Sequence, residues 1–122
     1  MNIKTLKRIL RNICDDGYAE WVPYFCTPDG ESYPINGRIW VDGDGDIYLF
    51  STYGDFPPYT TWDILKRLNK HYPNTYVYFK ALIQDHDYYS WDIEDYWYID
   101  TYNDEYYDEE FERLYIDCCE MD

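Results

Sequence analysis

The hydrophobic positions at the start of the chain recur at the spacing of an α-helix. The pattern predicts a helix over residues 3–14 with a single apolar stripe. The stripe consists of Ile3, Leu6, Leu10 and Ile13. A second face is basic and carries Lys4, Lys7, Arg8 and Arg11. Gly17 follows the helix and suits the left-handed conformation in which many helices end.

Short apolar runs separated by turn signals follow this helix. Residues 18–26 are expected to be extended, and Thr27-Pro28-Asp29-Gly30 to form a turn. The runs 38–41 and 47–52 flank Asp42-Gly43-Asp44-Gly45-Asp46, an arrangement that predicts a β-hairpin.

A second helix is predicted to begin after Thr60. Thr60 is a favourable N-cap residue, and Asp63 stands three residues later in a capping-box arrangement. Trp62, Leu65 and Leu68 are expected to face inward. Pro73-Asn74 is expected to end the helix.

Strict alternation predicts two strands in the second half of the chain. In residues 75–83, one face is apolar and carries Val77, Phe79, Ala81 and Ile83. In residues 91–102, the face expected to point inward carries Trp91, Ile93, Trp97 and Ile99. Asp95 interrupts this second pattern, so we expect a β-bulge or the edge of the sheet there.

Residues 105–120 read as a last helix. Its predicted inner stripe consists of Tyr107, Phe111, Leu114, Tyr115 and Cys118. Together these elements predict a single domain over residues 1–122, of the α+β class. We expect an antiparallel sheet of four to five strands with about three helices packed on it.

Charge is distributed very unevenly along this pattern. Residues 81–122 hold 15 Asp and Glu but a single basic residue, Arg113, whereas residues 1–80 hold 10 acids and 9 Lys and Arg. The net charge of −15 therefore lies almost entirely in the last third. Direct binding to nucleic acid or to an anionic membrane is disfavoured, because the phosphates would repel this charge.

Acids take the expected outward positions of both the last strand and the last helix, and tyrosines accompany them on the outward face of the strand. We predict that this acidic and aromatic surface, over about 85–122, binds a partner. Its candidate residues are Asp92, Glu94, Tyr96, Tyr98, Asp100, Tyr102, Asp104, Glu105, Asp108, Glu109 and Glu112. Side chains two apart on a strand lie roughly 6–7 Å apart, and duplex phosphates carry charge at a comparable density. Such a surface would fit a groove lined by Arg and Lys, on which Tyr and Trp can stack.

Candidate metal and catalytic residues are weaker. Asp42, Asp44 and Asp46 lack the Gly and Glu that an EF-hand loop needs, because Ile47 and Tyr53 stand there. The four cysteines, Cys14, Cys26, Cys118 and Cys119, lack paired zinc spacing. We therefore expect no metal and no cofactor.

The sequence contains no P-loop, GxGxxG, HExxH or GxSxG motif. A small enzyme that uses a carboxylate and a histidine remains an alternative, with His86 between Asp85 and Asp87 as the candidate. His71 stands near the end of the second predicted helix, where we expect it to interact with the helix dipole. Non-enzymatic function is the expectation. The N-terminus lacks a signal-peptide pattern, so we expect a cytoplasmic protein.

In size, in acidity and in the acidic and aromatic pattern of residues 88–120, the chain resembles small anti-defence proteins of phages and mobile elements. These include DNA-mimic anti-restriction proteins and anti-CRISPR proteins. The resemblance implies a stoichiometric inhibitor that blocks DNA or guide RNA from the basic groove of a CRISPR effector or restriction enzyme.

Two questions stay open at this point. Acidic immunity proteins that neutralise basic nuclease toxins resemble the chain equally well in composition. The basic first helix would also allow a homodimer, or would mask the acidic surface of the same chain.

Overall fold

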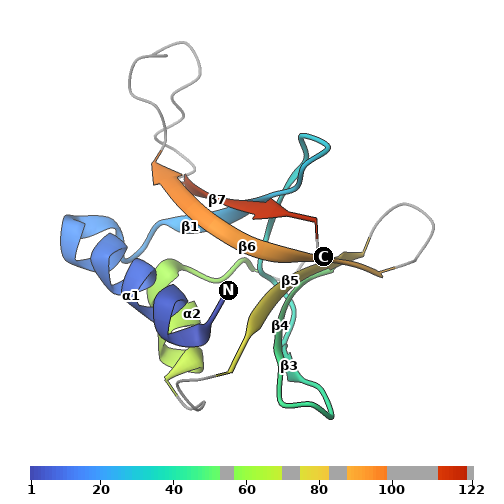
Figure 1. The fold of residues 1–122 in the computed structure, drawn as a ribbon. Coiled ribbons are helices and arrows are strands. Elements are labelled where there is room, and N and C mark those ends of the chain that lie inside the picture. Colours follow the sequence, from blue (N-terminus) through green and yellow to red (C-terminus); the bar gives the residue numbers. More distant parts are fainter. Residues whose placement is uncertain (53–56, 70–74, 83–87, 99–112, 121–122) are drawn as a thin grey trace.

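The computed structural model describes residues 1–52, 57–69, 75–82, 88–98 and 113–120, with the backbone alone at 82, 88, 95–98 and 113. These residues contain the helices α1 (Ile3–Ile13) and α2 (Thr61–Leu68), and α1 continues into one π-type turn, η1 (Cys14–Tyr18). The strands are β1 (Val22–Cys26), β2 (Ser32–Pro34), β3 (Ile39–Val41), β4 (Ile47–Ser51), β5 (Val77–Leu82), β6 (Tyr88–Tyr98) and β7 (Arg113–Cys119). All seven form one sheet in the order β2-β1-β7-β6-β5-β4-β3. The sheet curls into a half-barrel, with both helices on one side of it (Figure 1).

The sheet is mixed, which corrects the predicted antiparallel sheet of four to five strands with about three helices. β1 runs parallel to β7, β4 runs parallel to β5, and the other neighbours are antiparallel. Parallel neighbours need a crossover connection. α2 lies between β4 and β5 in the chain and supplies that crossover. The predicted elements therefore exist in part, but the way they connect was predicted wrongly.

The largest correction concerns the predicted helix over 105–120. Residues Arg113–Cys119 form β7, a central strand between β1 and β6. Leu114, Ile116 and Cys118 are buried, whereas Tyr115 and Asp117 are only partly buried, so burial alternates with period two. β1 and β6 both present backbone hydrogen-bonding groups to this segment. Pairing with both of them favours an extended strand over a helix. Residues 105–112 lie outside the described residues.

β6 confirms an irregularity at Asp95, where a β-bulge or the edge of the sheet was predicted. It is not at the edge, because it lies between β5 and β7. Its pairing with β7 shifts register between Ile93 and Asp95. Trp91 and Ile93 are buried as expected. Since a bulge adds one residue to one strand, the predicted alternation does not continue unbroken to Tyr98. The strand also begins at Tyr88, three residues before the predicted start at Trp91.

The core lies between the helices and the concave face of the sheet. α1 contributes the predicted Ile3, Leu6, Leu10 and Ile13, all without solvent exposure. β5 contributes Val77, Phe79 and Ala81, again as predicted. Phe79 stacks on Phe25 at 5.1 Å and on Trp91 at 5.7 Å between ring centroids, which joins β1, β5 and β6.

α2 begins with the predicted capping box. The Thr60 hydroxyl accepts from the Asp63 amide, and the Asp63 carboxylate accepts from the Thr60 amide. Leu65 and Leu68 face inward as expected, but Trp62 is 48% exposed, so its predicted inward position was wrong. Ile64 and Thr61 take the buried positions instead. Neither helix in the described part of the chain is long and apolar enough to cross a bilayer.

Both hairpin turns depend on a glycine with positive φ. The predicted hairpin of β3 and β4 closes through a bond from the Asp42 amide to Asp46 and turns at Gly45, whose φ is 86°. Gly30, with φ 91°, plays the same part between β1 and β2. In L-residues this conformation is disfavoured, which explains the glycines.

Candidate functional site

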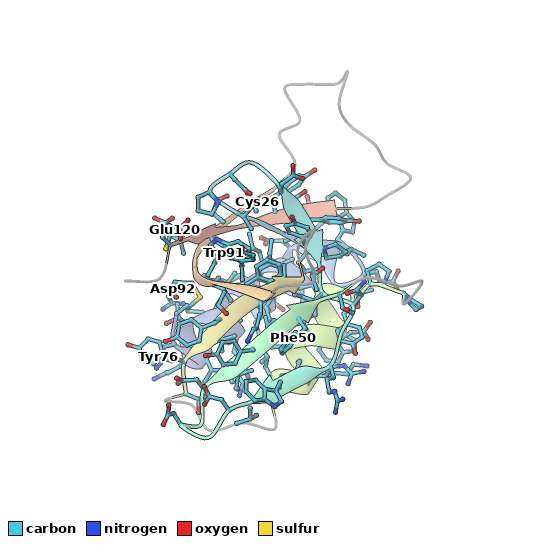
Figure 2. All side chains as sticks on the ribbon, turned by 90° about the vertical axis from the view of Figure 1, so that its right-hand side faces the viewer. Cys26, Phe50, Tyr76, Trp91, Asp92 and Glu120 are labelled. Atoms are coloured by element: carbon cyan, nitrogen blue, oxygen red, sulfur yellow. The ribbon has the colours of Figure 1, made fainter. Side chains whose placement is uncertain are left out.

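The outer face of the sheet, which points away from both helices, is the candidate functional surface (Figure 2). We call it the outer sheet face. Over β3, β4 and β5 it is aromatic and consists of Trp40, Tyr48, Phe50, Tyr76 and Tyr78, around Lys80. Over β6 and β7 it is acidic and includes Asp92 and Asp117, with Glu120 just beyond β7. In Figure 2, Glu120, Asp92 and Tyr76 follow one another down the left side.

The aromatic part is a continuous set of ring contacts across three strands. Trp40 pairs with Tyr48 in register, and Tyr48 with Tyr78, with ring centroids 5.5 Å apart in each case. Tyr76 stacks beside Tyr78 at 6.4 Å. Trp40 is 44% exposed and Tyr76 51% exposed. Large aromatic surfaces left exposed on a sheet are typical of binding sites, because water solvates them poorly.

Lys80 crosses the middle of this aromatic part. Its Nζ atom lies 5.1 Å from the ring centroid of Tyr48, 5.7 Å from that of Phe50 and 5.8 Å from that of Trp40. Cation–π attraction to three rings holds the ammonium group over the sheet. A positive charge is therefore positioned among aromatic rings in a strongly acidic chain.

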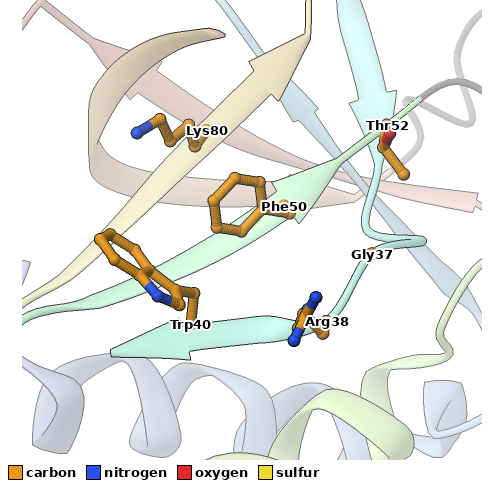
Figure 3. Close-up of a pocket in the computed structure, with 6 residues that line it drawn as sticks. All are labelled: Gly37, Arg38, Trp40, Phe50, Thr52 and Lys80. Carbon is orange, nitrogen blue, oxygen red and sulfur yellow. The ribbon is translucent and has the colours of Figure 1, made fainter. Parts of the chain in front are cut away.

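A pocket opens beside Lys80 at the β3 edge of the sheet (Figure 3). Its volume is about 550 Å³, and its lining comprises Gly37, Arg38, Trp40, Phe50, Thr52 and Lys80. Gly37 packs closely on Phe50: a Cβ at Gly37 would lie 2.9 Å from the Phe50 Cβ. The amides of Asn36 and Gly37 both donate to the Phe50 carbonyl, so the backbone that carries Arg38 is fixed to β4.

Carboxylates border the aromatic part on its other side. Asp42 and Asp46, in the β3–β4 turn, lie close enough to Tyr48 and Tyr78 to affect them. Partial burial, followed by these carboxylates, raises the pKa of both phenols. Burial, followed by Asp42 and Asp44, also raises the pKa of Asp46. The outer sheet face therefore combines neutral phenols with clustered negative charge.

Two of the predicted partner-binding residues have described side chains. Glu94 is exposed at the bulge of β6. The Asp92 side chain is 40% exposed, and its carboxylate accepts hydrogen bonds from the amino group of Met1 and the amide of Ile93. Asp92 is thus partly neutralised within the chain, which the sequence did not indicate.

The other predicted residues are less completely described. Tyr96 and Tyr98 lie on β6 opposite Ile116 and Leu114 of β7, and only their backbone is described. The remaining candidates lie outside the described residues: Asp100, Tyr102, Asp104, Glu105, Asp108, Glu109 and Glu112. His71 and His86 do so as well.

The cysteines form no zinc-like cluster in the described part of the chain. Cys118 is buried in the core and Cys119 faces the other side of β7. Burial raises the pKa of the Cys118 thiol well above its ordinary value. Burial and then Asp117 raise the pKa of Cys26 to about 11. Among the described residues, no group of three or more His, Cys, Asp or Glu is arranged to hold a metal.

The helix layer has the opposite charge to the acidic strands. α1 carries Lys4, Lys7, Arg8 and Arg11 and no acid. Lys4, Arg8 and Arg11 are exposed, and Lys7 is partly buried. Across the described ranges, no ion pair involves these four residues. Arg11 donates only a long hydrogen bond, 3.5 Å, to the Asn69 side chain. In this structure the basic helix therefore does not mask the described acids.

The pocket residues were not predicted from the sequence as a site. The hairpin of β3 and β4 and the strand β5 were each predicted. What no local pattern indicated is that β5 pairs in parallel with β4. That pairing brings Lys80 beside Phe50, with which it is in register.

The chain matches no protein-family model, and no curated protein and no solved structure matches it either. The geometry and charge of the outer sheet face are therefore the basis for a functional proposal.

Proposed function

We propose that this protein is a stoichiometric inhibitor that binds the basic nucleic-acid groove of a nuclease in the cytoplasm of the host cell. The expected target is a CRISPR effector or a restriction enzyme, whose DNA or guide RNA the inhibitor displaces. The observation that carries the proposal is the segregation of charge, with a formal −14 on residues 81–122. Like charges on one part of a fold repel one another, so their concentration calls for a basic partner.

The outer sheet face supports this proposal by its chemistry. Glu94 is exposed there, and Asp117 and Glu120 add carboxylates on and beyond β7. Exposed Trp40 and Tyr76 supply flat surfaces on which arginine side chains can stack. Tyr, Trp and Arg are the residue types that most often dominate the energy of protein interfaces.

A titration with purified nucleases tests the proposal. The panel comprises CRISPR effectors, restriction enzymes and a basic nuclease toxin, since an immunity protein would use the same surface chemistry. We expect DNA cleavage by one nuclease of the panel to decrease linearly as the protein is added and to stop at a 1:1 molar ratio of protein to nuclease. We also expect pre-bound DNA to protect that nuclease, because both ligands occupy one groove. Inhibition that pre-bound DNA leaves unchanged would contradict the proposed mechanism.

Charge reversal tests the predicted contribution of the acidic segment 85–122. The quadruple variant Glu105→Lys, Asp108→Lys, Glu109→Lys and Glu112→Lys is expected to weaken inhibition at least 100-fold, because like charges now face the groove. The matched control reverses four exposed acids outside this segment: Asp15, Asp16, Glu20 and Glu31. Both variants change the net charge equally. Equal loss of inhibition in the two variants would mean that the nuclease recognises the total charge of the protein and not the acidic segment 85–122.

A further inference from the structure

The pocket beside Lys80 has a charge that the acidic surface does not explain. Outside α1 and α2, the basic residues with described side chains are Arg38 and Lys80, and both line this pocket. They come from positions 42 residues apart in the chain, which the parallel pairing of β4 and β5 brings together. Two cations that meet at one pocket in a chain of net charge −15 favour an anionic ligand.

The rest of the lining favours a ligand with a flat ring. Trp40 is 44% exposed, so much of its indole surface is open to a ligand. Phe50 adds a second ring from the adjacent strand, edge-on to Trp40 at 6.4 Å between centroids. The Thr52 hydroxyl is a hydrogen-bond donor and acceptor at the far end of the lining (Figure 3). A volume of about 550 Å³ lies within the range of small-molecule sites.

The two cations differ in what they can offer a ligand. Arg38 is exposed, and among the described residues no ion pair or hydrogen bond involves its guanidinium group. A guanidinium group can bind a phosphate or carboxylate through two parallel hydrogen bonds. Lys80 is held by three rings and supplies a fixed point charge. The close contact of Gly37 with Phe50 keeps the Arg38 backbone beside the pocket.

We propose that this pocket binds a small ligand in which a flat aromatic ring is joined to an anionic group, with a nucleoside monophosphate as the best-fitting class. The ring stacks on Trp40, and the anion is bound by Arg38 in the field of Lys80. The pocket lies over β3, β4 and β5, whereas the carboxylates of the proposed inhibitor surface lie on and beyond β6 and β7. Trp40 belongs both to the pocket and to the aromatic part of the outer sheet face.

Isothermal titration of the full chain tests this site with AMP as the probe. Adenosine supplies the ring without the phosphate, and inorganic phosphate supplies the anion without the ring. Phenyl phosphate supplies a ring and a phosphate without ribose. We expect AMP to bind at least tenfold more tightly than adenosine or inorganic phosphate. Tighter binding of AMP than of phenyl phosphate supports the nucleotide class. The reverse order overturns that class.

Two substitutions separate the contributions of the pocket. Arg38→Ala is expected to weaken the binding of AMP at least tenfold and to leave the binding of adenosine unchanged. Trp40→Ala is expected to weaken the binding of both ligands. Arg8→Ala and Trp62→Ala are the matched controls, since both residues are exposed on the helix layer. Circular dichroism checks that each variant is folded. Absence of AMP binding, or undiminished binding in Arg38→Ala and Trp40→Ala, would overturn the proposal without affecting that of nuclease inhibition.

Discussion

Phe79 shows how much of this fold depends on single side chains. It has no solvent exposure, and its ring stacks on Phe25 and Trp91 from two other strands. Because protein interiors are closely packed, a cavity at this position cannot be filled by small movements of its neighbours. One residue therefore holds three strands of the curled sheet in contact.

The substitution Phe79→Ala is expected to lower the free energy of unfolding by about 3–5 kcal/mol, the usual cost of removing a buried phenyl ring. Urea denaturation monitored by circular dichroism measures this change. Tyr76→Ala, at a position that is 51% exposed, is the control and should cost little. Equal effects of the two substitutions would show that Phe79 does not have this central role.

Cys26 makes a prediction about reactivity. Burial and Asp117 raise its pKa from 9.0 to about 11, so at pH 8 its thiolate fraction is about 100-fold smaller than that of an ordinary thiol. We expect iodoacetamide to alkylate Cys26 about 100-fold more slowly in the folded protein than in urea, as measured by mass spectrometry. Cys14→Ser, Cys118→Ser and Cys119→Ser in one chain isolate this reaction.

The same shift has a consequence for stability, with a definite sign. A thiol whose pKa is raised by folding favours the folded state while it stays protonated. Its contribution is therefore complete below about pH 9 and is lost as the pH rises toward 11. A loss of stability over this range that is the same in Cys26→Ala would contradict the assignment to Cys26.

At the scale of elements, α2 depends on its cap because it is short. It has 8 residues, and helices of this length are marginal without stabilising end contacts. The Thr60 and Asp63 side chains each accept from the other's amide, which satisfies two amides that the helix leaves unbonded. The cap also fixes where the crossover between β4 and β5 begins.

Thr60→Ala is expected to destabilise the protein by about 1 kcal/mol, the typical cost of losing an N-cap. Thermal and urea denaturation measure this loss. Thr60→Asp keeps an acceptor at the same position and should retain most of the stability. If Thr60→Asp costs as much as Thr60→Ala, the hydroxyl acts through packing and not through the cap.

β7 shows where a local pattern is ambiguous. Leu114, Tyr115 and Cys118 fit a helical stripe, and Leu114, Ile116 and Cys118 fit an alternating strand equally well. The two patterns share most of their residues, so the sequence of this segment could not decide between them. The segment forms a strand because its backbone pairs with β1 on one side and with β6 on the other.

At the scale of the whole molecule, charge is divided between layers. α1 and α2 are basic, whereas the strands β6 and β7 carry carboxylates. Acids outnumber basic residues by 25 to 10 in the chain, which leaves a net charge of −15. Repulsion among the acids therefore opposes folding, and dissolved salt should relieve it.

We expect the melting temperature to rise by several degrees when NaCl is raised from 10 to 150 mM, because the Debye length falls from about 30 Å to about 8 Å. Differential scanning calorimetry measures the shift. The quadruple reversal at positions 105, 108, 109 and 112 changes the net charge from −15 to −7. Salt should therefore raise the melting temperature of this variant by less. A melting temperature that salt leaves unchanged would show that repulsion is not a significant destabilising effect.

Features that depend on neighbours in the chain could be predicted from the sequence. Helical spacing placed Leu6 and Leu10 in the core, the capping-box spacing placed the start of α2, and Asp95 marked the bulge. Each of these features depends on residues that are only a few positions apart, so it can be recognised in the sequence. The concentration of charge in the last third is likewise a property of the sequence alone.

The choice of which strands are neighbours could be read only from the folded structure. Hydrogen bonds between strands are alike at every position, so local patterns do not specify that β4 pairs with β5 or that β7 lies between β1 and β6. Those pairings made the sheet mixed and replaced a predicted helix with a strand. They also brought Arg38, Phe50 and Lys80 together, because a pocket between strands exists only once the strands are adjacent.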